Sequence, residues 1–330
     1  MKNSLVSILI PVYNRERLIE QTVRSAMNQT YKNIEIIIVD NKSTDNTWEI
    51  LERLSKEDNR IKIFQNETNI GPVRNWRRCI EEASGEFGKI LWSDDLISPD
   101  FIEKTVPFME DPDVGFVFTG TEIFVDGTNE KILYYFIGQT GIYKSSEYIK
   151  GVLFNGNYAV SPGCAIFRLK DLKNNLKVDI PNKVNSDFSM HAIGNDMLIF
   201  LLTAHQYKNF AFVNQKLSFF RSHKDSITIK SNIGKLVLYR TLAGAYFVEN
   251  FRKDLIKKMN TKIWLDIRIF SKEAKKYNLD KIKNYYLHNS DFNIDIIYLA
   301  YLLNKNDFGK IIIGKIINKI HNKIMRRWRE

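Results

Sequence analysis

The sequence predicts an α/β protein, with a mostly parallel β-sheet flanked by helices and a helical C-terminal region. Residues 5–10 and 34–39 are short, almost wholly apolar runs, typical of strands buried on both faces of a parallel sheet. Each run is followed by a segment with helical periodicity. Strands and helices therefore alternate over roughly the first 120 residues, which favours helices on both faces of the sheet. From Gly234 onwards the pattern is helical throughout.

The individual elements follow from this alternation. Strands are expected over residues 5–10, 34–39, 61–64, 90–92, 114–118 and 165–168. Helices are expected over residues 15–28, 45–54, 73–82, 99–109 and 197–205. Asn14 is expected to cap the first helix, and Ser98 with Pro99 offers an N-cap and first-turn pair for the helix at 99–109. Residues 124–127 predict a turn between two strands.

The length and composition are those of an ordinary globular protein. A chain of 330 residues can form one large α/β domain or two smaller ones. Cys79 and Cys164 have no paired spacing, which excludes a cysteine-based zinc site and indicates a reducing compartment. No apolar run approaches the roughly 18 residues of a membrane span, and Pro11 ends the first run before any signal-peptide cleavage site. We therefore expect a cytoplasmic protein.

The net charge of +11 is concentrated in the last third of the chain. From Ile227 to the end there are 22 basic and 9 acidic residues, whereas the rest of the chain has 27 basic and 29 acidic residues. This distribution indicates an anionic partner for the C-terminal third alone.

Two adjacent carboxylates, Asp94 and Asp95, come directly after the apolar end of the expected strand 90–92. The carboxyl edge of an open α/β sheet is where ligands bind. Two neighbouring acids repel each other there, and a divalent cation that prefers oxygen ligands offsets their charge well. A helix-capping acid beside a solvated one explains the pair equally well, so these two residues alone leave both interpretations open.

The turns after the first two strands narrow the choice of ligand. Residues 11–16 contain no glycine, which excludes the Gly-x-Gly-x-x-Gly turn of a dinucleotide-binding fold, and no P-loop is present. Asp40, at the end of the second strand, is placed to accept hydrogen bonds from a base N–H or a ribose hydroxyl. Tyr13 is placed to stack on that base. In the alternative interpretation, Asp40 caps a turn and Tyr13 fills the sheet edge.

Five separated motifs together carry a family resemblance. They are Val6-Ser7-Ile8-Leu9-Ile10-Pro11-Val12-Tyr13-Asn14, Ile36-Ile37-Ile38-Val39-Asp40, Asn69-Ile70-Gly71, Arg74-Asn75 and Ser93-Asp94-Asp95. In this order they resemble the family 2 inverting glycosyltransferases of the GT-A fold, and the resemblance covers roughly residues 4–226. It is specific because each motif alone would be weak.

The resemblance implies a role for each matching residue. The nucleotide-binding residues would be Pro11, Tyr13, Asp40, Arg74 and Asp94. Asp40 would bind the base, taken to be uracil, with Tyr13 flanking it, and Arg74 would lie near the phosphates. Asp94 would hold the ribose region, and Asp95 would coordinate Mn²⁺ or Mg²⁺ bridging the diphosphate. Many family members carry another acid two positions before Asp94, where this chain has Trp92.

The resemblance also implies a general base. The family has an acidic pair where this chain reads Asn195-Asp196, and the second acid, which acts as the base, is retained. Its position at a helix N-terminus favours the ionised form that a base requires. The alternative is a first-turn carboxylate that only stabilises the helix.

Two further residues match a family segment near the diphosphate, in which an Arg-x-His pair recurs. Arg221 is a candidate phosphate contact, and His223 is a candidate metal ligand through a ring nitrogen. A surface histidine with only a structural role is the alternative. His191 and His205 carry no functional assignment.

The end of the chain predicts a basic amphipathic helix. Over residues 308–330, isoleucines and Trp328 fall on one helical face while lysines and arginines fill the other. This pattern is typical of a helix that lies on an anionic membrane surface. A helix packed on the catalytic domain with a solvated basic face is the alternative. No recognisable module supports nucleic-acid binding.

Taken together, the sequence predicts a metal-dependent, inverting glycosyltransferase that moves a sugar from a UDP-sugar to a hydroxyl of a glycan or lipid-linked glycan. The expected domains are residues 1–226, with a nucleotide-sugar half at about 1–119 and an acceptor half at about 120–226, and a basic helical region at 227–330. Such an enzyme would serve cell-surface polysaccharide synthesis at the inner face of the plasma membrane. A sugar nucleotidyltransferase and a non-catalytic nucleotide-binding protein on the same fold are the alternatives.

Overall fold

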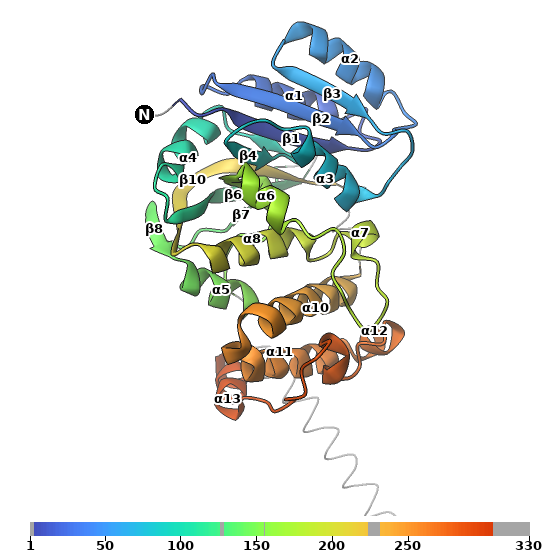
Figure 1. Ribbon diagram of the computed structural model, residues 1–330, viewed down its shortest axis with the longest axis vertical. Coiled ribbons are helices and arrows are strands. Elements are labelled where there is room, and N and C mark those ends of the chain that lie inside the picture. The colour runs from blue at the N-terminus through green and yellow to red at the C-terminus, as the bar shows by residue number, and fades with distance from the viewer. Residues whose placement is uncertain (1–2, 126–128, 155, 224–231, 306–330) are drawn as a thin grey trace, which may run out of the picture.

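The computed structural model describes residues 3–125, 129–154, 156–223 and 232–305. Within these residues one ten-stranded mixed sheet forms the centre of the molecule, in the order β3-β2-β1-β4-β9-β6-β10-β5, with β7 paired to β6 and β8 to β10. Helices cover both faces of the sheet, and a set of C-terminal helices lies beneath it (Figure 1). The predicted mostly parallel α/β sheet with a helical C-terminal region is confirmed.

The N-terminal half is the expected parallel sheet. Its strands are β1 (Val6–Val12), β2 (Ile34–Asp40), β3 (Ile61–Gln65) and β4 (Phe87–Ile90), and its helices are α1 (Ile19–Met27), α2 (Thr47–Glu57) and α3 (Pro72–Glu81). Every residue of β1 and β2 is buried, which is why these strands read as almost wholly apolar runs. Val12 pairs with Asp40, so the first two strands end side by side.

The second half of the sheet is mixed. Its elements are β5 (Leu96–Ile97), α4 (Phe101–Met109), β6 (Val114–Val125), β7 (Lys131–Tyr134), β8 (Gly141–Lys144), α5 (Ser145–Leu153), η1 (Pro162–Cys164), β9 (Ala165–Arg168), α6 (Leu169–Asn175), α7 (Phe188–His191), α8 (Asn195–Gln206) and β10 (Asn209–Ser222). Strand β9 is antiparallel to both of its neighbours, β4 and β6, and joins the two halves of the sheet. The long strands β6 and β10 are parallel to each other.

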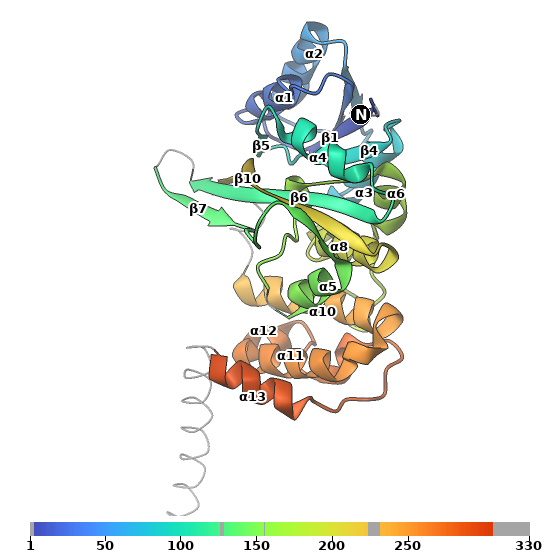
Figure 2. The same ribbon diagram turned by 90° about the vertical axis from the view of Figure 1, so that its left-hand side faces the viewer.

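The C-terminal helices pack under α5 and α8 (Figures 1 and 2). They are α10 (Ile233–Phe251), η2 (Lys253–Leu255), α11 (Ile256–Ile269), α12 (Ser271–Lys276), η3 (Ile282–Tyr285) and α13 (Ile296–Lys305). Glu249, buried on α10, accepts the backbone N–H groups of residues 287–289 and so fastens the loop that leads to α13. No helix in the described part of the chain has the length and apolar character needed to cross a membrane.

Three local expectations are wrong. Strand β4 ends at Ile90 rather than Trp92, so the two aspartates lie in a turn, closed by a hydrogen bond from the Asp95 N–H to the Trp92 carbonyl. The helix expected from residue 99 begins at Phe101, because the Ser98 hydroxyl donates to the Asp100 carboxylate instead of capping the helix.

The third wrong expectation concerns the first helix. Asn14 has a φ of 50° and accepts a hydrogen bond from the Thr44 N–H, so it joins two loops instead of capping a helix. Helix α1 therefore begins at Ile19, later than the expected start.

Strand β10 was not expected from the sequence. Its apolar alternation is interrupted at residues 214–216, which are exposed, and its pairing with β6 shifts register there. Such bulges insert residues that a period of two does not accommodate. The helix expected over residues 308–330 lies outside the described residues and stays a prediction, as does the part of the 124–127 turn at residues 126 and 127.

Phe116 is expected to be the most sensitive position of the core. It is fully buried on β6, and its ring lies 5.1 Å from that of Phe200 and 5.6 Å from that of Phe210. Phe116→Ala should lower the free energy of unfolding by about 3–5 kcal/mol, because it removes apolar contacts and leaves a cavity. Phe292→Ala, at a 40% exposed position, is the control for urea denaturation. Equal losses in both variants would contradict this placement of the core.

Candidate active site

The turn that carries Asp94 and Asp95 is held by the end of β10. The backbone N–H of Arg221 donates to Asp95 Oδ1 at 2.9 Å, and the Arg221 Nε donates to the Asp94 carbonyl at 3.0 Å. His223 Nε2 lies 3.0 Å from Asp94 Oδ2. The residues that sequence analysis assigned to the diphosphate therefore meet, although about 125 positions separate them in the chain.

Two residues that the sequence analysis did not identify complete this cluster. Arg15 Nη2 lies 3.6 Å from Asp94 Oδ2, and the buried Arg15 Nε has no hydrogen-bond partner among the described residues. Gln21, on α1, accepts a hydrogen bond of 2.7 Å from Arg221 Nη2. The position of Arg15 directly after the first motif was the available signal, whereas nothing in the sequence points to Gln21.

The negative charges of the aspartate turn are not fully neutralised by neighbouring groups. Asp95 is buried, and this burial raises the pKa of its carboxyl, as does the like charge of Asp94; the Arg221 N–H bond and the Lys89 ammonium act in the opposite direction. Lys89 is itself fully buried on β4, and this burial lowers the pKa of the ammonium to about 7. Lys89 Nζ donates to the carbonyls of Ile90 and Gly163. The pair of carboxylates is therefore only partly compensated by the protein.

This donor set fits a divalent cation that is shared with a bound phosphate. Mg²⁺ sites commonly use one or two carboxylates together with substrate phosphate oxygens. Asp94 and Asp95 supply the carboxylates, and the His223 ring contacts the first of them. In the described residues, no cluster of three or more His, Cys, Asp or Glu side chains is arranged to hold a metal ion by itself. The metal assignments of Asp95 and His223 stay predictions.

The expected base-binding residues lie together at the ends of β1 and β2. Pro11 pairs with Val39 in the sheet, and Tyr13, 40% exposed, follows directly after the residue that pairs with Asp40. The Asp40 carboxylate is buried and accepts hydrogen bonds from Gln65 Nε2, at 2.9 Å, and from the backbone and side chain of Ser43. Asp40 thus caps its turn, as the alternative interpretation held, and its contact with a base stays a prediction.

A network of buried asparagines shapes the neighbouring loop. Asn66 Nδ2 donates to Asn41 Oδ1 and to Asn75 Oδ1, both at 2.8 Å. Asn75 Nδ2 in turn donates to the Val39 carbonyl at 3.0 Å. These bonds tie the loop before α3 to the end of β2. Asn69 joins the network by accepting a hydrogen bond from Asn41 Nδ2 at 2.8 Å. The sequence analysis singled out only Asn69 and Asn75 of this network, as parts of motifs.

Arg74 projects from the first turn of α3 toward α7. Its side chain is exposed, and Nη1 donates to Ser189 Oγ at 2.6 Å. Gly71, directly before the helix, has a φ of 85°, and a Cβ there would lie 2.6 Å from Met190 Sδ. The structure therefore directs the Arg74 side chain toward α7, and its proximity to phosphates stays a prediction.

Trp92 stands two positions before Asp94, where the family resemblance implied an acid. Its ring centroid lies 4.7 Å from that of Trp76, and its Nε1 donates to Ser161 Oγ at 2.9 Å. A Cβ on Gly163 would lie 2.8 Å from the Trp92 ring, so the indole is closely packed. This residue forms an aromatic wall beside the aspartate turn.

Asp196 stands at the start of α8, as expected. Its Oδ1 accepts the Met197 N–H at 2.7 Å. Burial raises the pKa of Asp196, and the Arg240 guanidinium and the backbone N–H groups at the helix start oppose that rise without cancelling it. The helix N-terminus favours the ionised form, as expected, but desolvation outweighs this effect on the pKa of Asp196, and the role of this residue as a base stays a prediction. Arg240 was not identified from the sequence.

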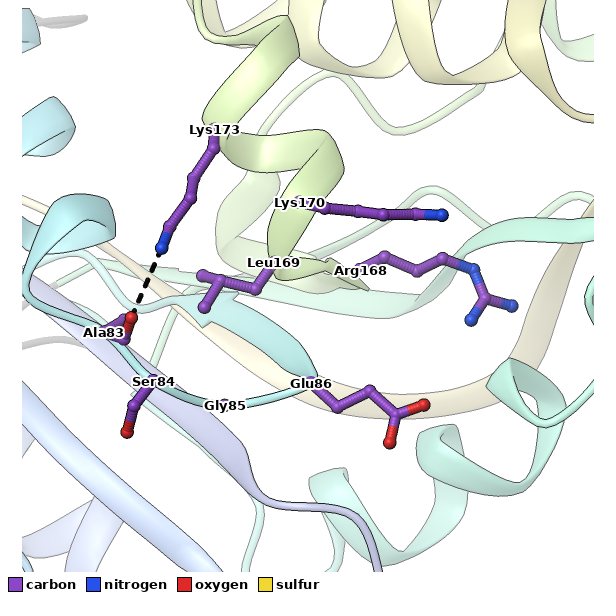
Figure 3. Close-up of a pocket in the computed structure, with 8 residues that line it drawn as sticks. All are labelled: Ala83, Ser84, Gly85, Glu86, Arg168, Leu169, Lys170 and Lys173. Atoms are coloured by element: carbon purple, nitrogen blue, oxygen red, sulfur yellow. Dashed lines mark hydrogen bonds between the residues drawn. The ribbon is translucent and has the colours of Figure 1, made fainter.

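A separate hollow lies at the opposite edge of the sheet, before β4 (Figure 3). It has a volume of about 410 Å³ and carries the basic side chains of Arg168, Lys170 and Lys173. Arg168 Nη2 donates to the Met109 and Asp111 carbonyls, and Lys173 Nζ to the Ala83 carbonyl. Because two of these cations already bind the backbone, the hollow has a structural explanation.

The sheet order and the aspartate turn at its carboxyl edge define a GT-A type α/β fold. The sequence matches the family model described as "Glycosyl transferase family 2" over residues 7–176, which is just over half of the chain. The chain therefore belongs to glycosyl transferase family 2.

Known proteins of this kind resemble parts of the chain. An "Uncharacterized glycosyltransferase" of Haemophilus influenzae is 41% identical over 109 residues, which are 33% of this chain and 44% of the relative. The "GalNAc(5)-diNAcBac-PP-undecaprenol beta-1,3-glucosyltransferase" of Campylobacter jejuni is 40% identical over 91 residues, 27% of this chain and 29% of the relative. The chain thus spans less than half the length of these relatives.

A solved structure resembles the chain over most of its length. S. aureus TarS (residues 1–349) in complex with UDP-GlcNAc superposes with a TM-score of 0.56 at 17% identity, covering 85% of this chain and 89% of that one. At this identity, the likeness supports the fold.

The asparagine network predicts which side chains hold the loop before α3 against the end of β2. Asn75→Ala should lower the free energy of unfolding by about 1–3 kcal/mol, because it removes two buried hydrogen bonds, one to the Val39 carbonyl and one from the Asn66 amide. Asn174→Ala, at an exposed position on α6, is the matched control. Urea denaturation of both variants measures the difference, and an unchanged Asn75→Ala protein would show that the network does not hold the loop.

Proposed function

We propose that this chain is an inverting glycosyltransferase that moves a hexosyl or related group from a UDP-sugar to a hydroxyl of a lipid-linked glycan. The observation that carries the proposal is the turn of Asp94 and Asp95, which β10 holds at the carboxyl edge of the sheet beside Asp40. Family membership supports sugar transfer, and the TarS complex with UDP-GlcNAc supports UDP as the nucleotide.

The donor would lie across the ends of β1, β2 and β4. Asp40 would accept a uracil N–H in exchange for one of its present turn contacts, and the exposed Tyr13 ring would cover the base. The diphosphate would meet Arg15, whose buried Nε has no partner in the described part of the chain, and Arg221. Charge-assisted hydrogen bonds from guanidinium groups suit phosphate oxygens.

Asp95 is the proposed holder of a Mn²⁺ or Mg²⁺ ion, with Asp94 on the ribose side and His223 beside it. A divalent cation at this place supplies neutralisation of the negative charge that builds up on the leaving diphosphate. Asp95 suits this task because it is buried and its charge is only partly compensated. The residues around it fix the carboxylate through the Arg221 N–H.

Asp196 is the proposed general base. The acceptor oxygen forms a bond to the anomeric carbon, the bond from that carbon to the diphosphate oxygen breaks, and the hydroxyl proton passes to the Asp196 carboxylate. Burial raises the pKa of Asp196, which makes the carboxylate a better proton acceptor than an exposed aspartate.

The acceptor half and the C-terminal region complete the proposal. The Campylobacter relative is named for an undecaprenol-linked acceptor, and this supports a lipid-linked acceptor here. We assign the donor and acceptor halves to residues 1–226 and the basic helical region to 227–330, with residues 308–330 on an anionic membrane surface as the sequence suggests. This would place the enzyme in cell-surface polysaccharide synthesis at the cytoplasmic face.

Asp95→Asn tests the metal and donor site. The variant should bind UDP in the presence of Mn²⁺ at least about tenfold more weakly and lose slow Mn²⁺-dependent hydrolysis of the donor sugar, because the charged ligand is gone. Its thermal stability without ligand should not fall, since a buried, repelled charge has been removed.

Asp113→Asn, at an exposed carboxylate paired with Lys208, is the matched control. Calorimetric titration with UDP and a panel of nucleotide sugars measures the binding. Unchanged Mn²⁺-dependent binding in the Asp95 variant would remove it as the metal ligand.

Asp196→Asn tests the base. Sugar transfer should fall by about 10²–10⁴-fold, while UDP binding in the presence of Mn²⁺ is retained, because only the proton acceptor is lost. In the unaltered enzyme the base works when ionised, so activity is present above the pKa of Asp196 and is lost as the pH falls through it. Since burial raises this pKa, the acid limb of kcat/KM should lie above the ordinary value of 3.8.

Thermal melting over the same pH range separates this limb from acid unfolding. Full transfer by the Asp196→Asn variant would contradict the assignment.

A further inference from the structure

A cavity of about 560 Å³ opens between the sheet domain and the C-terminal helices. It is lined by residues of β7, α5, α8, α10, α11 and α13, and its volume is in the range of small-molecule sites. The lining is mostly apolar, and its aromatic members are Tyr134, Tyr135, Tyr158, Phe270 and Tyr298. Neither the donor site nor the proposed base accounts for a cavity of this kind.

One wall of the cavity reaches the proposed base. Met197, the residue after Asp196, lines the cavity, and so do Arg240 and Tyr135. The charge of Arg240 lowers the pKa of Asp196, and the pKa of Tyr135 is raised first by burial and in part by the charge of Asp196. The cavity and the base are therefore close neighbours.

Tyr135 is held in a strained conformation at this junction. Its φ is 64°, in the left-handed region that bulky side chains avoid, and its backbone N–H lies 3.4 Å from Asn157 Oδ1. Strain of this kind persists where the surrounding structure requires a particular side-chain placement, and such places are commonly functional. Here the placement presents an aromatic ring to the cavity beside the base.

The polar groups of the cavity include one cation whose side chain makes no hydrogen bond or ion pair with the described residues. Lys262 pairs with Asp266 at 3.1 Å, and Asp266 also accepts the Thr241 hydroxyl. The Arg240 side chain, by contrast, is exposed, and its charge acts on Asp196 without direct contact. A guanidinium in this setting suits a phosphate group.

The mouth of the cavity is apolar as well. Ile233 is 68% exposed and Tyr134 is 43% exposed, and both line the cavity. Isolated exposed apolar residues are common, but here they continue an apolar interior outward. A soluble, uncharged glycan would not cover this apolar surface and would offer no negative charge to Arg240.

We propose that this cavity binds the phosphate and the adjoining apolar chain of a lipid-linked acceptor, with Arg240 contacting the phosphate and the acceptor sugar lying toward Asp196. This inference rests on the proposed function and specifies the acceptor for it. It accounts for three features at once: the apolar lining, the Arg240 side chain, which has no hydrogen-bond partner among the described residues, and the strained Tyr135 beside the proposed base.

Farnesyl phosphate is the probe, because it joins an isoprenoid chain to a phosphate and carries no sugar. Equilibrium dialysis of the full chain below the probe's aggregation concentration should show saturable binding, with farnesol and inorganic phosphate each binding at least about tenfold more weakly. Arg240→Ala should weaken binding of farnesyl phosphate about tenfold or more, the loss of a charge-assisted hydrogen bond.

A second variant changes the mouth of the cavity and leaves its interior side chains unaltered. Ile233→Asp places a negative charge at the mouth, at an exposed first-turn position where an acid is favourable to the helix, and should also weaken binding about tenfold. Arg268→Ala is the matched control, since Arg268 lies against Trp264 on α11 and does not line the cavity. It should bind like the unaltered protein.

Equal binding by all three variants, or farnesol binding as tightly as its phosphate, would overturn the proposal. Binding of UDP with Mn²⁺ to the unaltered protein is measured separately. If the unaltered protein does not bind UDP with Mn²⁺, the proposed donor is contradicted. If it binds UDP but does not bind farnesyl phosphate, the cavity assignment alone is contradicted.

Discussion

The hydrogen bond from the Arg221 backbone N–H to Asp95 is the contact on which the site depends. It joins the last strand of the sheet to the turn after β4, and the His223 ring and the Arg221 side chain reinforce the same junction. Two adjacent carboxylates in a buried turn repel each other, so their position requires donors that come from elsewhere in the chain. Strand β10 supplies them, because β5, which directly follows the turn, pairs antiparallel with it.

The two candidate functional regions of the molecule differ in polarity. At the carboxyl edge, Asp40 and the aspartate turn form a polar surface whose charges are partly met by Arg15, Lys89 and Arg221. Below the sheet, Asp196 lies at the start of α8 in a more apolar region, which the C-terminal helices close from the other side. One sheet thus presents a charged edge, which we propose for a diphosphate, and an apolar cavity, which we propose for a lipid-linked acceptor, and Asp196 lies next to that cavity.

Much of the first half was predictable from the sequence. Buried parallel strands read as apolar runs, so β1, β2 and β3 were expected within a residue or two, and β9 was expected with its exact bounds. Asp40 and Asp94 were found because they follow apolar runs, and Asp196 was found because it stands at the start of a helix. The structure brings Asp94 and Asp95 together with Arg221 and His223, but it leaves their roles toward a nucleotide or metal as predictions.

By itself, the sequence determined the alternation of strands and helices, the family, and the acids that follow the apolar runs. Each of these depends on local periodicity or on short motifs. Only the tertiary structure decided which cations face those acids, how desolvation outweighs the helix terminus at Asp196, and that Arg240 and Tyr135 stand at a cavity. These depend on burial and on contacts between distant segments. Bulges interrupt the period of two in β10, and no local sequence pattern shows that the single carboxylate of Asp196 is desolvated.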